Sequence, residues 1–229
     1  MTTTNDKAIV KDYFNAVGFE RWRRIYGETE EVNKVQKDIR LGHQQTIDTV
    51  MEWLQADGNL AQISVCDAGC GVGSLSIPLA KAGAKVCASD ISEKMVTEAK
   101  QKAKLALGNT DNVSFAVQDL ESLNGKYHTV ICLDVLIHYP AEDAAKMISH
   151  LASLADSRLI LSFAPKTLFL VILKKIGEFF PGPSKTTRAY QHKEAEIIRI
   201  LIDNGFHIER KGTTSTSFYF SDILEAVRD

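Results

Sequence analysis

The chain has 229 residues and a mass of 25.4 kDa, enough for one full α/β domain with a modest accessory part. Its composition, 45% hydrophobic and 24% charged, is typical of a globular protein and excludes a disordered or fibrous chain. The formal net charge of −2 excludes a strongly basic protein that binds nucleic acid through its overall field. No apolar run reaches the roughly 18 residues that a membrane-spanning helix needs.

The N-terminus and the cysteines favour a reducing, cytoplasmic location. Residues 1–7 have neither the apolar core nor the cleavage pattern of a signal peptide. The four cysteines lie in or beside expected core strands, so we expect small buried apolar side chains rather than disulfides or a metal cluster. They are Cys66, Cys70, Cys87 and Cys132.

Residues 5–57 are predicted to be helical, because apolar residues recur there at helical spacing with few turn-forming residues between them. Arg21 and Arg24 lie three positions apart and would share one helix face. That face could hold a carboxylate, and a solvated charged face is the alternative. Tyr26 and Gly27 stand at an expected helix end, which predicts a mobile arm that closes over the site with a phenol at its hinge.

Residues 64–74 read S-V-C-D-A-G-C-G-V-G-S, which predicts a buried strand, a tight glycine turn and a helix start. The spacing D-x-G-x-G-x-G, with Asp67 followed by Gly69, Gly71 and Gly73, differs from the dinucleotide fingerprint G-x-G-x-x-G. Asp67 at the strand end would repel a pyrophosphate and attract a ligand with a cationic amino-acid tail.

Two further acids follow the next two expected strands. Asp90 is placed to accept hydrogen bonds from ribose hydroxyls, and Ser92 is a good N-cap for the helix that follows. Asp119 is placed to accept a hydrogen bond from an adenine amino group. Together with the glycine loop, these acids resemble the S-adenosylmethionine site of class I methyltransferases; a Rossmann domain that binds NAD, or no nucleotide, is the alternative. The expected donor-site residues are Asp67, Gly69, Cys70, Gly71, Gly73, Asp90, Ile91, Met95, Asp119, Leu120 and Leu133.

The order of the remaining elements predicts an α/β fold. Strands are expected at 64–67, 85–90, 113–118, 129–133 and 159–164, and helices at 74–82, 92–106, 141–154 and 194–204. This alternation indicates a mostly parallel sheet with helices on both faces. No helix separates the runs 206–211 and 218–227, so an antiparallel hairpin should complete a Rossmann-like class I methyltransferase sheet.

We expect a single domain over residues 1–229, with an N-terminal helical arm at 1–57 and a donor-binding core at 58–229. Residues 165–190 form an apolar insertion in that core. A helix packed on the core is one interpretation of it. The other is a surface for a flat apolar substrate or a membrane interface, with Lys174 and Lys175 reaching the polar boundary.

Residues that follow the fourth strand should line the acceptor side of the crevice. His138 is expected near the donor methyl group, and a structural histidine is the alternative. Asp134 is interpreted as a helix-start or loop cap and not as a base.

The chain is also similar to one specific family, the magnesium-protoporphyrin O-methyltransferases of chlorophyll synthesis, over nearly its whole length. The similarity rests on the segments Tyr13-Phe14-Asn15, Glu20-Arg21-Trp22, Ile25-Tyr26-Gly27, Arg40-Leu41-Gly42-His43, Asp67-Ala68-Gly69-Cys70-Gly71 and 133–139.

The resemblance implies methyl transfer from S-adenosylmethionine to a propionate of magnesium-protoporphyrin IX, giving the monomethyl ester and S-adenosylhomocysteine. A propionate is already ionised at neutral pH and needs no strong base, so His138 and Tyr26 would steer the carboxylate or approach the chelated magnesium. Magnesium enters only as part of the substrate. Arg21, Arg24, His43 and Lys185 are further candidate carboxylate contacts.

The resemblance further implies a photosynthetic cell, a cytoplasmic or loosely thylakoid-bound enzyme, and handover from the porphyrin-binding subunit of magnesium chelatase. The alternatives are another small-molecule methyltransferase, such as a quinone-pathway enzyme, and a non-catalytic donor-binding partner. A nucleic-acid methyltransferase is disfavoured because no basic stripe and no Asn-Pro-Pro-Tyr-type motif are present.

Overall fold

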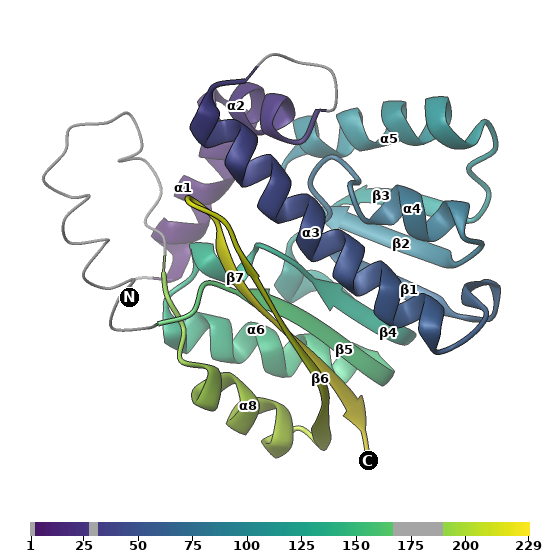
Figure 1. The fold of residues 1–229 in the computed structure, drawn as a ribbon, viewed down its shortest axis with the longest axis vertical. Helices are drawn as coiled ribbons and strands as arrows, with labels where there is room; N and C mark the ends of the chain where they lie inside the picture. Colours follow the sequence, from purple (N-terminus) through teal and green to yellow (C-terminus); the bar gives the residue numbers. More distant parts are fainter. Residues whose placement is uncertain (1–2, 28–31, 167–189) are drawn as a thin grey trace, which may run out of the picture.

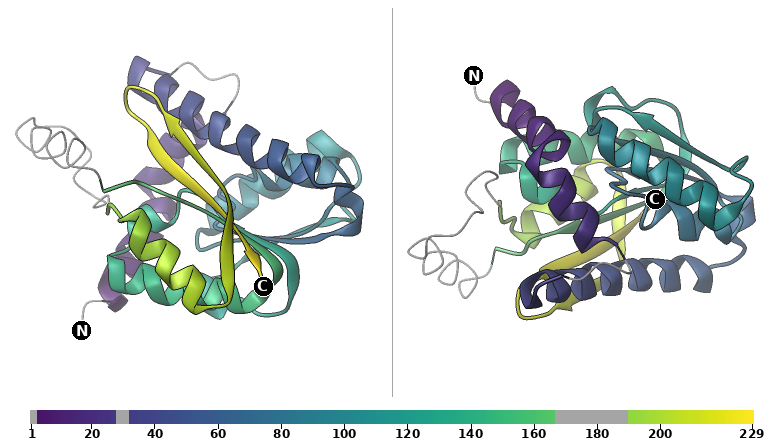
Figure 2. Two further views of the ribbon diagram at one scale, coloured as in Figure 1. Left: turned by 60° about the horizontal axis from the view of Figure 1, so that its bottom comes forward. Right: turned by 90° about the horizontal axis from the view of Figure 1, so that it is seen from above.

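A computed structural model describes residues 3–27, 32–166 and 190–229. In this structure a seven-stranded sheet with strand order β3-β2-β1-β4-β5-β7-β6 lies between two layers of helices (Figures 1 and 2). The strands are β1 (Ser64–Ala68), β2 (Lys85–Asp90), β3 (Val113–Val117), β4 (Tyr127–Cys132), β5 (Ala155–Phe163), β6 (Phe206–Ser215) and β7 (Phe220–Arg228). Strands β1 to β5 pair in parallel and β7 is antiparallel to both β5 and β6. The predicted fold class and its terminal hairpin are confirmed.

The N-terminal region consists of separate helices rather than one continuous helical stretch. The described helices are α1 (Thr3–Asn15), α2 (Val17–Ile25), α3 (Lys34–Ala56), α4 (Ser76–Lys81), α5 (Glu93–Leu107), α6 (Ala141–Leu154) and α8 (Glu194–Asp203), with 3-10 turns η1 (Leu60–Gln62), η2 (Leu120–Ser122) and η3 (Leu136–His138). A capping box starts α3: the Asn33 side chain accepts from the Gln36 amide, and the Gln36 side chain accepts from the Asn33 amide. The expected cap at Ser92 is confirmed, because its Oγ accepts from the Met95 amide 3.3 Å away.

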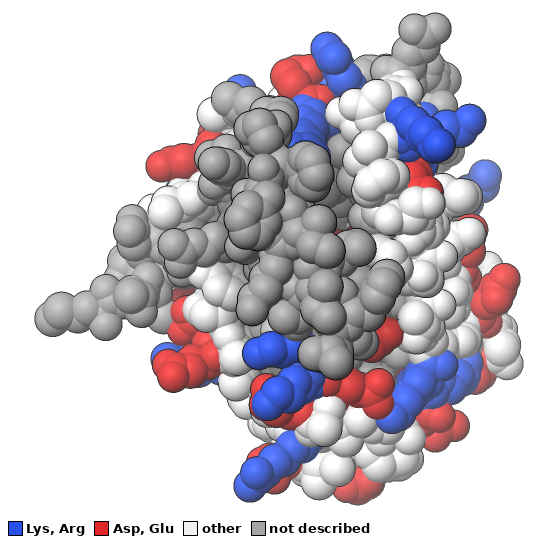
Figure 3. Space-filling model, turned by 60° about the vertical axis from the view of Figure 1, so that its left-hand side comes forward, with Lys and Arg blue, Asp and Glu red and all other residues white. Residues whose placement is uncertain are grey.

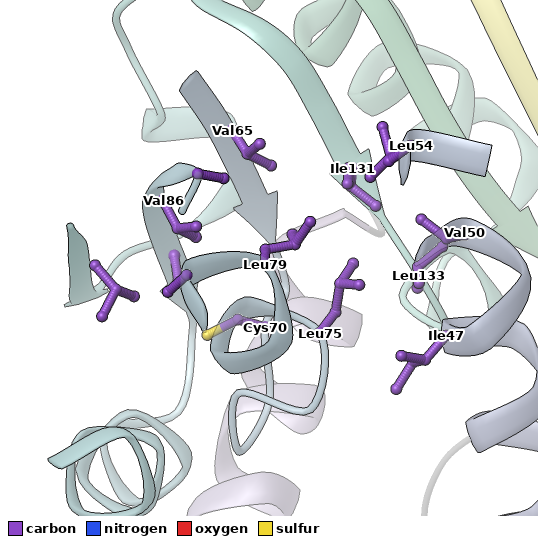
Figure 4. Close-up of a cluster of buried hydrophobic side chains, with 14 of the residues drawn as sticks. Ile47, Val50, Leu54, Val65, Cys70, Leu75, Leu79, Val86, Ile131 and Leu133 are labelled. Carbon is purple, nitrogen blue, oxygen red and sulfur yellow. The ribbon is translucent and has the colours of Figure 1, made fainter. Parts of the chain in front are cut away.

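Side chains alternate across the sheet and create two apolar clusters. One lies between the sheet and the helices α3, α4 and α5, and the other lies between the sheet and the helices α6 and α8. Ile47, Val50 and Leu54 of α3 point towards Leu75, Ile131 and Leu133 in the first cluster (Figure 4). Helix α3 is therefore held by burial of its apolar face, whereas α2 lies at its N-terminal end and α1 packs on α2 and α5 (Figure 1).

The β6–β7 hairpin extends beyond the sheet and reaches α3. The Thr216 hydroxyl and the Phe218 amide both donate to the Asp38 carboxylate, each over 2.6 Å. Gly42 allows the close approach, because a Cβ there would lie 2.4 Å from the Tyr219 ring. Strand β6 ends at Ser215, four residues past the expected end, and the hairpin tip thereby stands beside the carboxyl ends of the parallel strands.

One cysteine contradicts the sequence analysis. Cys66, Cys70 and Cys132 are buried, as predicted, but Cys87 is exposed. Its strand β2 lies towards the β3 edge of the sheet, and α6 and α8 cover the strands β4, β5 and β7 instead. The prediction of a buried Cys87 is wrong because strand alternation alone does not say which face a helix will cover.

The predicted apolar insertion lies almost entirely outside the described residues, which stop at 166 and resume at 190. Within the described part of the chain, no helix is both long and apolar enough to cross a bilayer. On the face in Figure 3, the described Lys and Arg side chains are interspersed with Asp and Glu instead of gathering in one patch.

Candidate active site

A cavity of about 320 Å³ opens past the carboxyl ends of β1, β2 and β4, where ligands bind in open parallel sheets. The glycine loop and the acids that end β1 and β2 form one side of it. Aromatic and apolar side chains from α1, α2, α3, η3 and the hairpin tip form the other side. The lining includes the predicted residues Tyr26, Asp67, Gly69, Cys70, Gly71, Asp90, Ile91, Met95, Leu120, Leu133 and His138.

The glycine loop needs residues without side chains. Gly69, Gly71 and Gly73 have φ angles of 89°, 52° and 83°, in the region where other residues are strained. A Cβ on Gly69 would also lie 2.2 Å from Cγ2 of Val135. The Gly71 amide donates to Oδ2 of Asp90 over 3.0 Å, so the loop after β1 is fastened to the end of β2.

Asp67 is a buried carboxylate whose negative charge is only partly stabilised by neighbouring protein groups. Its Oδ2 accepts a hydrogen bond from the Ser76 hydroxyl. Burial raises the pKa of Asp67 to about 6, and the Ser76 bond offsets only part of that effect. Burial also raises the pKa of Asp90. A cationic ligand on this side of the cavity would favour the ionised form of both acids, which fits an S-adenosylmethionine molecule with its ammonium and sulfonium groups.

Two predicted donor residues do not line the cavity. Gly73 packs near Ile77 and Ala99 instead. The Asp119 carboxylate accepts from the Glu121 amide over 3.2 Å and so starts η2. Its neighbours on either side, Gln118 and Leu120, both line the cavity, and Gln118 was not anticipated. The assignment of Asp119 to an adenine amino group stays a prediction.

His138 stands in η3 with its imidazole beside the ring of Phe14, edge-on at a centroid distance of 5.3 Å. Burial lowers the pKa of His138 to about 4, an effect that the charge of Asp134 opposes. Its Nδ1 is buried and has no hydrogen-bond partner among the described residues. His138 is therefore a neutral imidazole at pH 7, with a ring nitrogen left for a ligand.

Tyr26 caps the C-terminus of α2, as the sequence predicted, and its ring lies between those of Trp22 and His43. The centroid distances are 5.3 Å and 4.3 Å. Arg40 of α3 donates to the carbonyl oxygens of Ile25 and Arg24 over 2.9 Å and 2.7 Å, which satisfies the last turn of α2. Burial raises the pKa of Tyr26 well above its usual value, so the phenol stays neutral and able to donate.

Asp134 lies at the centre of a network that the sequence did not predict. Its carboxylate accepts from the Tyr219 hydroxyl over 2.8 Å and the Ser162 hydroxyl over 3.2 Å, and it lies 2.7 Å from Nδ1 of His43. The network continues to Thr46, whose Oγ1 is 3.1 Å from the Tyr219 oxygen. Burial opposes ionisation of Asp134, but these hydrogen bonds outweigh it and lower its pKa.

The interpretation of Asp134 as a local cap is wrong, because its side chain bonds to α3, β5 and the hairpin tip. Its backbone has φ 57°, a strained angle for a residue with a side chain. Tyr219 and Ser162 were missed because they lie 85 and 28 positions from Asp134, and only an aromatic run at 218–220 marked the hairpin tip. Neither Arg21 nor Arg24 lines the cavity, and Lys185 lies outside the described residues.

Comparison with known proteins identifies the family. A model described as the C-terminus of magnesium-protoporphyrin IX methyltransferase matches residues 132–228, and a methyltransferase-domain model matches residues 65–157. Magnesium-protoporphyrin O-methyltransferase of Synechocystis is 71% identical over 98% of this chain and 97% of that protein. The chain belongs to the magnesium-protoporphyrin IX methyltransferase family.

Other members of the magnesium-protoporphyrin IX methyltransferase family are also similar to this chain. The chloroplastic enzyme of Arabidopsis thaliana is 62% identical over 97% of this chain and 71% of that protein, and the Rhodobacter capsulatus enzyme is 31% identical over 94% of both. A crystal structure of the Synechocystis enzyme with bound S-adenosylhomocysteine superposes with a TM-score of 0.91 at 70% identity, covering 97% of this chain and all of that one. A second, with bound S-adenosylmethionine, gives a TM-score of 0.87 at 64% identity and covers 98% of both chains. The predicted family, fold and methyl donor are confirmed.

Proposed function

We propose that this chain transfers a methyl group from S-adenosylmethionine to a propionate carboxylate of magnesium-protoporphyrin IX, forming the monomethyl ester in chlorophyll biosynthesis. The observation that carries the proposal is the 71% identity to a magnesium-protoporphyrin O-methyltransferase over 98% of the chain, a span that includes the aromatic arm, the glycine loop and the hairpin tip. A ubiquinone biosynthesis O-methyltransferase matches at 31% over 69% of the chain, so a quinone acceptor has weaker support.

The acids and the glycine loop would hold the donor. Asp67 and Asp90 supply negative charge on that side of the cavity, and the loop leaves its backbone open to a ligand: nothing lies within 4 Å of a Cβ built on Gly71. The donor supplies an electrophilic methyl group on a sulfonium sulfur. We assign the adenine end of the cavity to the segment Gln118–Leu120, with Asp119 at its edge.

The acceptor needs orientation more than activation. A propionate is ionised at neutral pH, so an oxygen lone pair forms the new O–C bond as the S–C bond breaks, and no proton moves. His138, neutral and with an unpaired Nδ1, and Tyr26, a neutral phenol, would position the carboxylate. Holding the reacting groups in line can lower the barrier by about 7 to 11 kcal/mol.

The direct test follows ester formation from S-adenosylmethionine and magnesium-protoporphyrin IX by chromatography. The wild-type protein is expected to form the monomethyl ester, and Tyr26→Phe and His138→Ala are expected to slow it without abolishing it. Donor binding in calorimetry without any ester would refute the porphyrin assignment and leave a quinone-type acceptor or a donor-binding partner as the function.

We further propose that the N-terminal part of the arm, α1 and α2, closes over the acceptor and excludes water. Support comes from the position of α1 and α2: Phe14, Trp22 and Tyr26 line the cavity, and the Ser92 hydroxyl donates to the Phe14 carbonyl oxygen and to Asn15 Oδ1 over 3.1 Å and 2.9 Å. The whole of residues 1–229 acts as one domain in this proposal. Hydrogen exchange should slow at residues 8–26 when donor and porphyrin are both present.

The partner and location are proposals as well. The apolar sequence at 168–180, with Lys174 and Lys175, is suited to peripheral contact with a thylakoid membrane by an otherwise cytoplasmic protein. Handover of the porphyrin from the porphyrin-binding subunit of magnesium chelatase would keep the pigment out of water. Flotation with anionic liposomes and a pull-down with that subunit test the two contacts separately.

A further inference from the structure

The cavity presents an electrostatic problem for a substrate that enters as a carboxylate. Three acids line it, Asp67, Asp90 and Asp134. Among the described residues that line the cavity there is no lysine and no arginine. A carboxylate would be repelled by these acids in a partly desolvated site, so a second positive group beside the donor sulfonium is needed on the acceptor side.

Histidines are the described lining residues that can supply this charge, and the cavity has two of them. His138 is neutral at pH 7, because burial lowers its pKa to about 4. The ring of His43 lies directly against a carboxylate, with Nδ1 2.7 Å from Oδ2 of Asp134.

The surroundings of Asp134 fix both the tautomer and the orientation of His43. Tyr219 donates within reach of both oxygens of Asp134 and Ser162 donates to one of them, so the carboxylate is held in place and its ionised form is favoured. An ionised carboxylate requires a proton on the facing Nδ1. The ring of Tyr26 lies against the imidazole at 4.3 Å and limits its rotation.

The second nitrogen of His43 is left without a function in the protein itself. Nε2 is buried and has no hydrogen-bond partner among the described residues, and such groups are costly to leave unpaired. It belongs to a side chain of the cavity wall, on the opposite edge of the ring from Asp134. A ligand atom within hydrogen-bond distance would satisfy it.

We propose that His43 is the carboxylate-binding residue of the acceptor site: its ring lies between two carboxylates, with Asp134 held at Nδ1 and a propionate oxygen accepting a hydrogen bond from Nε2. The inference rests on the proposed function, since it names the contact that recognises the acid group of that acceptor. His43 does not act as a base, because the methyl transfer releases no proton. Its contribution is a charge-assisted hydrogen bond that favours the acid over its ester.

The test compares binding of magnesium-protoporphyrin IX with binding of its dimethyl ester, which keeps the ring and lacks both carboxylates. Quenching of tryptophan fluorescence in the presence of S-adenosylhomocysteine reports each affinity. In His43→Asn the side-chain amide takes the place of Nδ1 and can still bond to Asp134, whereas no atom of the new side chain takes the place of Nε2. We expect the diacid to bind this variant about ten- to a hundredfold more weakly, the size of a hydrogen bond to a charged group, with unchanged affinity for the diester.

Two further variants separate this role from a structural one. His43→Gln places a neutral donor near the Nε2 position and should retain part of the preference for the acid. His207→Gln is the matched control, since His207 makes the same kind of pair with Asp229 on the surface, 2.6 Å apart, and should change neither affinity. Calorimetry with S-adenosylhomocysteine verifies that each variant is folded.

An unchanged ratio of diacid to diester affinity in folded His43→Asn would overturn the inference, and so would an equal loss for both ligands. If His43→Asn fails to bind S-adenosylhomocysteine, the same affinities are compared in His43→Gln. A diacid-to-diester affinity ratio equal to that of wild type in His43→Gln would then contradict carboxylate binding by His43. A wild-type protein that makes no ester from the diacid would instead refute the proposed function, which this binding ratio does not measure.

Discussion

The buried Asp67 carboxylate destabilises the ligand-free protein and is suited to bind a cationic ligand. Its raised pKa of about 6, against the ordinary 3.8, means that burial disfavours the ionised carboxylate in the folded protein by about 3 kcal/mol. Protonated Asp67 does not destabilise the folded protein. As the pH rises from about 4 to about 6, the folded state holds this proton more tightly than the unfolded state does, so the free energy of unfolding falls over that range. The ligand-free protein therefore carries an unfavourable charge at pH 7.5 that a cationic donor would stabilise.

Asp67→Asn should separate these two effects. We expect the free energy of unfolding of the ligand-free protein to rise by about 1 to 3 kcal/mol at pH 7.5, because the buried charge is gone, and the gain should vanish near pH 4. Affinity for S-adenosylmethionine should fall in the same variant. Urea denaturation at the two pH values and calorimetry measure both quantities, and a variant less stable than wild type at pH 7.5 would contradict the account.

Gly42 is the residue that lets the hairpin tip reach the site. A Cβ at this position would overlap the Tyr219 ring at 2.4 Å, and the Tyr219 hydroxyl would then be displaced from Asp134. Gly42→Ala should cost about 1 to 3 kcal/mol of stability, as overpacking does, and lower kcat/KM for the porphyrin several-fold.

The matched control for Gly42→Ala is Leu41→Ala on the same helix, since Leu41 is an exposed neighbour. Its stability should stay within about 0.5 kcal/mol of wild type. Equal losses of stability and kcat/KM in the two variants would mean that any substitution in this part of α3 lowers activity, and the contact between Gly42 and Tyr219 would not be the cause.

At the scale of elements, α3 bonds to the last turn of α2. The guanidinium of Arg40 bonds to two carbonyl oxygens there, those of Ile25 and Arg24. This contact fixes the position of Tyr26, which follows immediately. Arg40 is thus a positioning residue that acts on the acceptor site through α2, without lining the cavity itself.

Arg40→Ala should release the end of α2. We expect faster amide exchange at residues 22–27 and a several-fold lower kcat/KM, while donor affinity stays near the wild-type value because the glycine loop is untouched. Lys37→Ala, on the exposed side of the same helix, is the control. Unchanged exchange at α2 in the Arg40 variant would show that other contacts hold the arm.

At the scale of the whole molecule, a buried ionic cluster ties α3 to the far end of the sheet. Glu225 of β7 is fully buried, with its oxygens 3.0 Å from Nε of Arg158 and 2.9 Å from Nε of Arg210. Both arginines also pair with Asp57 just after α3. Burial opposes ionisation of Asp57, but these arginines outweigh it and lower its pKa.

Glu225→Ala leaves two arginines without their buried partner and should lower the free energy of unfolding by about 3 to 5 kcal/mol. Glu209→Ala, an exposed acid on β6, should change it by less than about 0.5 kcal/mol. Urea denaturation measures both. The folded fraction of Glu225→Ala should still bind the donor with wild-type affinity, because no residue of the cluster lines the cavity.

Local patterns in the sequence determined the glycine-loop side of the cavity. A strand, its glycine turn and the acid at its end are contiguous, so the spacing of residues alone predicts that Asp67, Gly69, Gly71 and Asp90 lie together, and all four line the cavity. The alternation of elements predicts the parallel sheet. The expected helix end and the end of the fourth strand also pointed to Tyr26 and His138, and both line the cavity. The sequence missed the exposure of Cys87, which depends on where the helices pack.

Only the tertiary structure decided the other side of the cavity. His43 was one of several candidate carboxylate contacts in the sequence, and only the structure pairs it with Asp134. Asp134, Ser162 and Tyr219 come from the loop after β4, β5 and the hairpin tip, and the sequence predicted none of their contacts. A hydrogen bond between residues 85 or more positions apart leaves no periodic or local signal in one sequence. Which acid is a donor contact, a cap or the partner of a histidine is set by packing, because burial and the choice of neighbour determine charge and orientation.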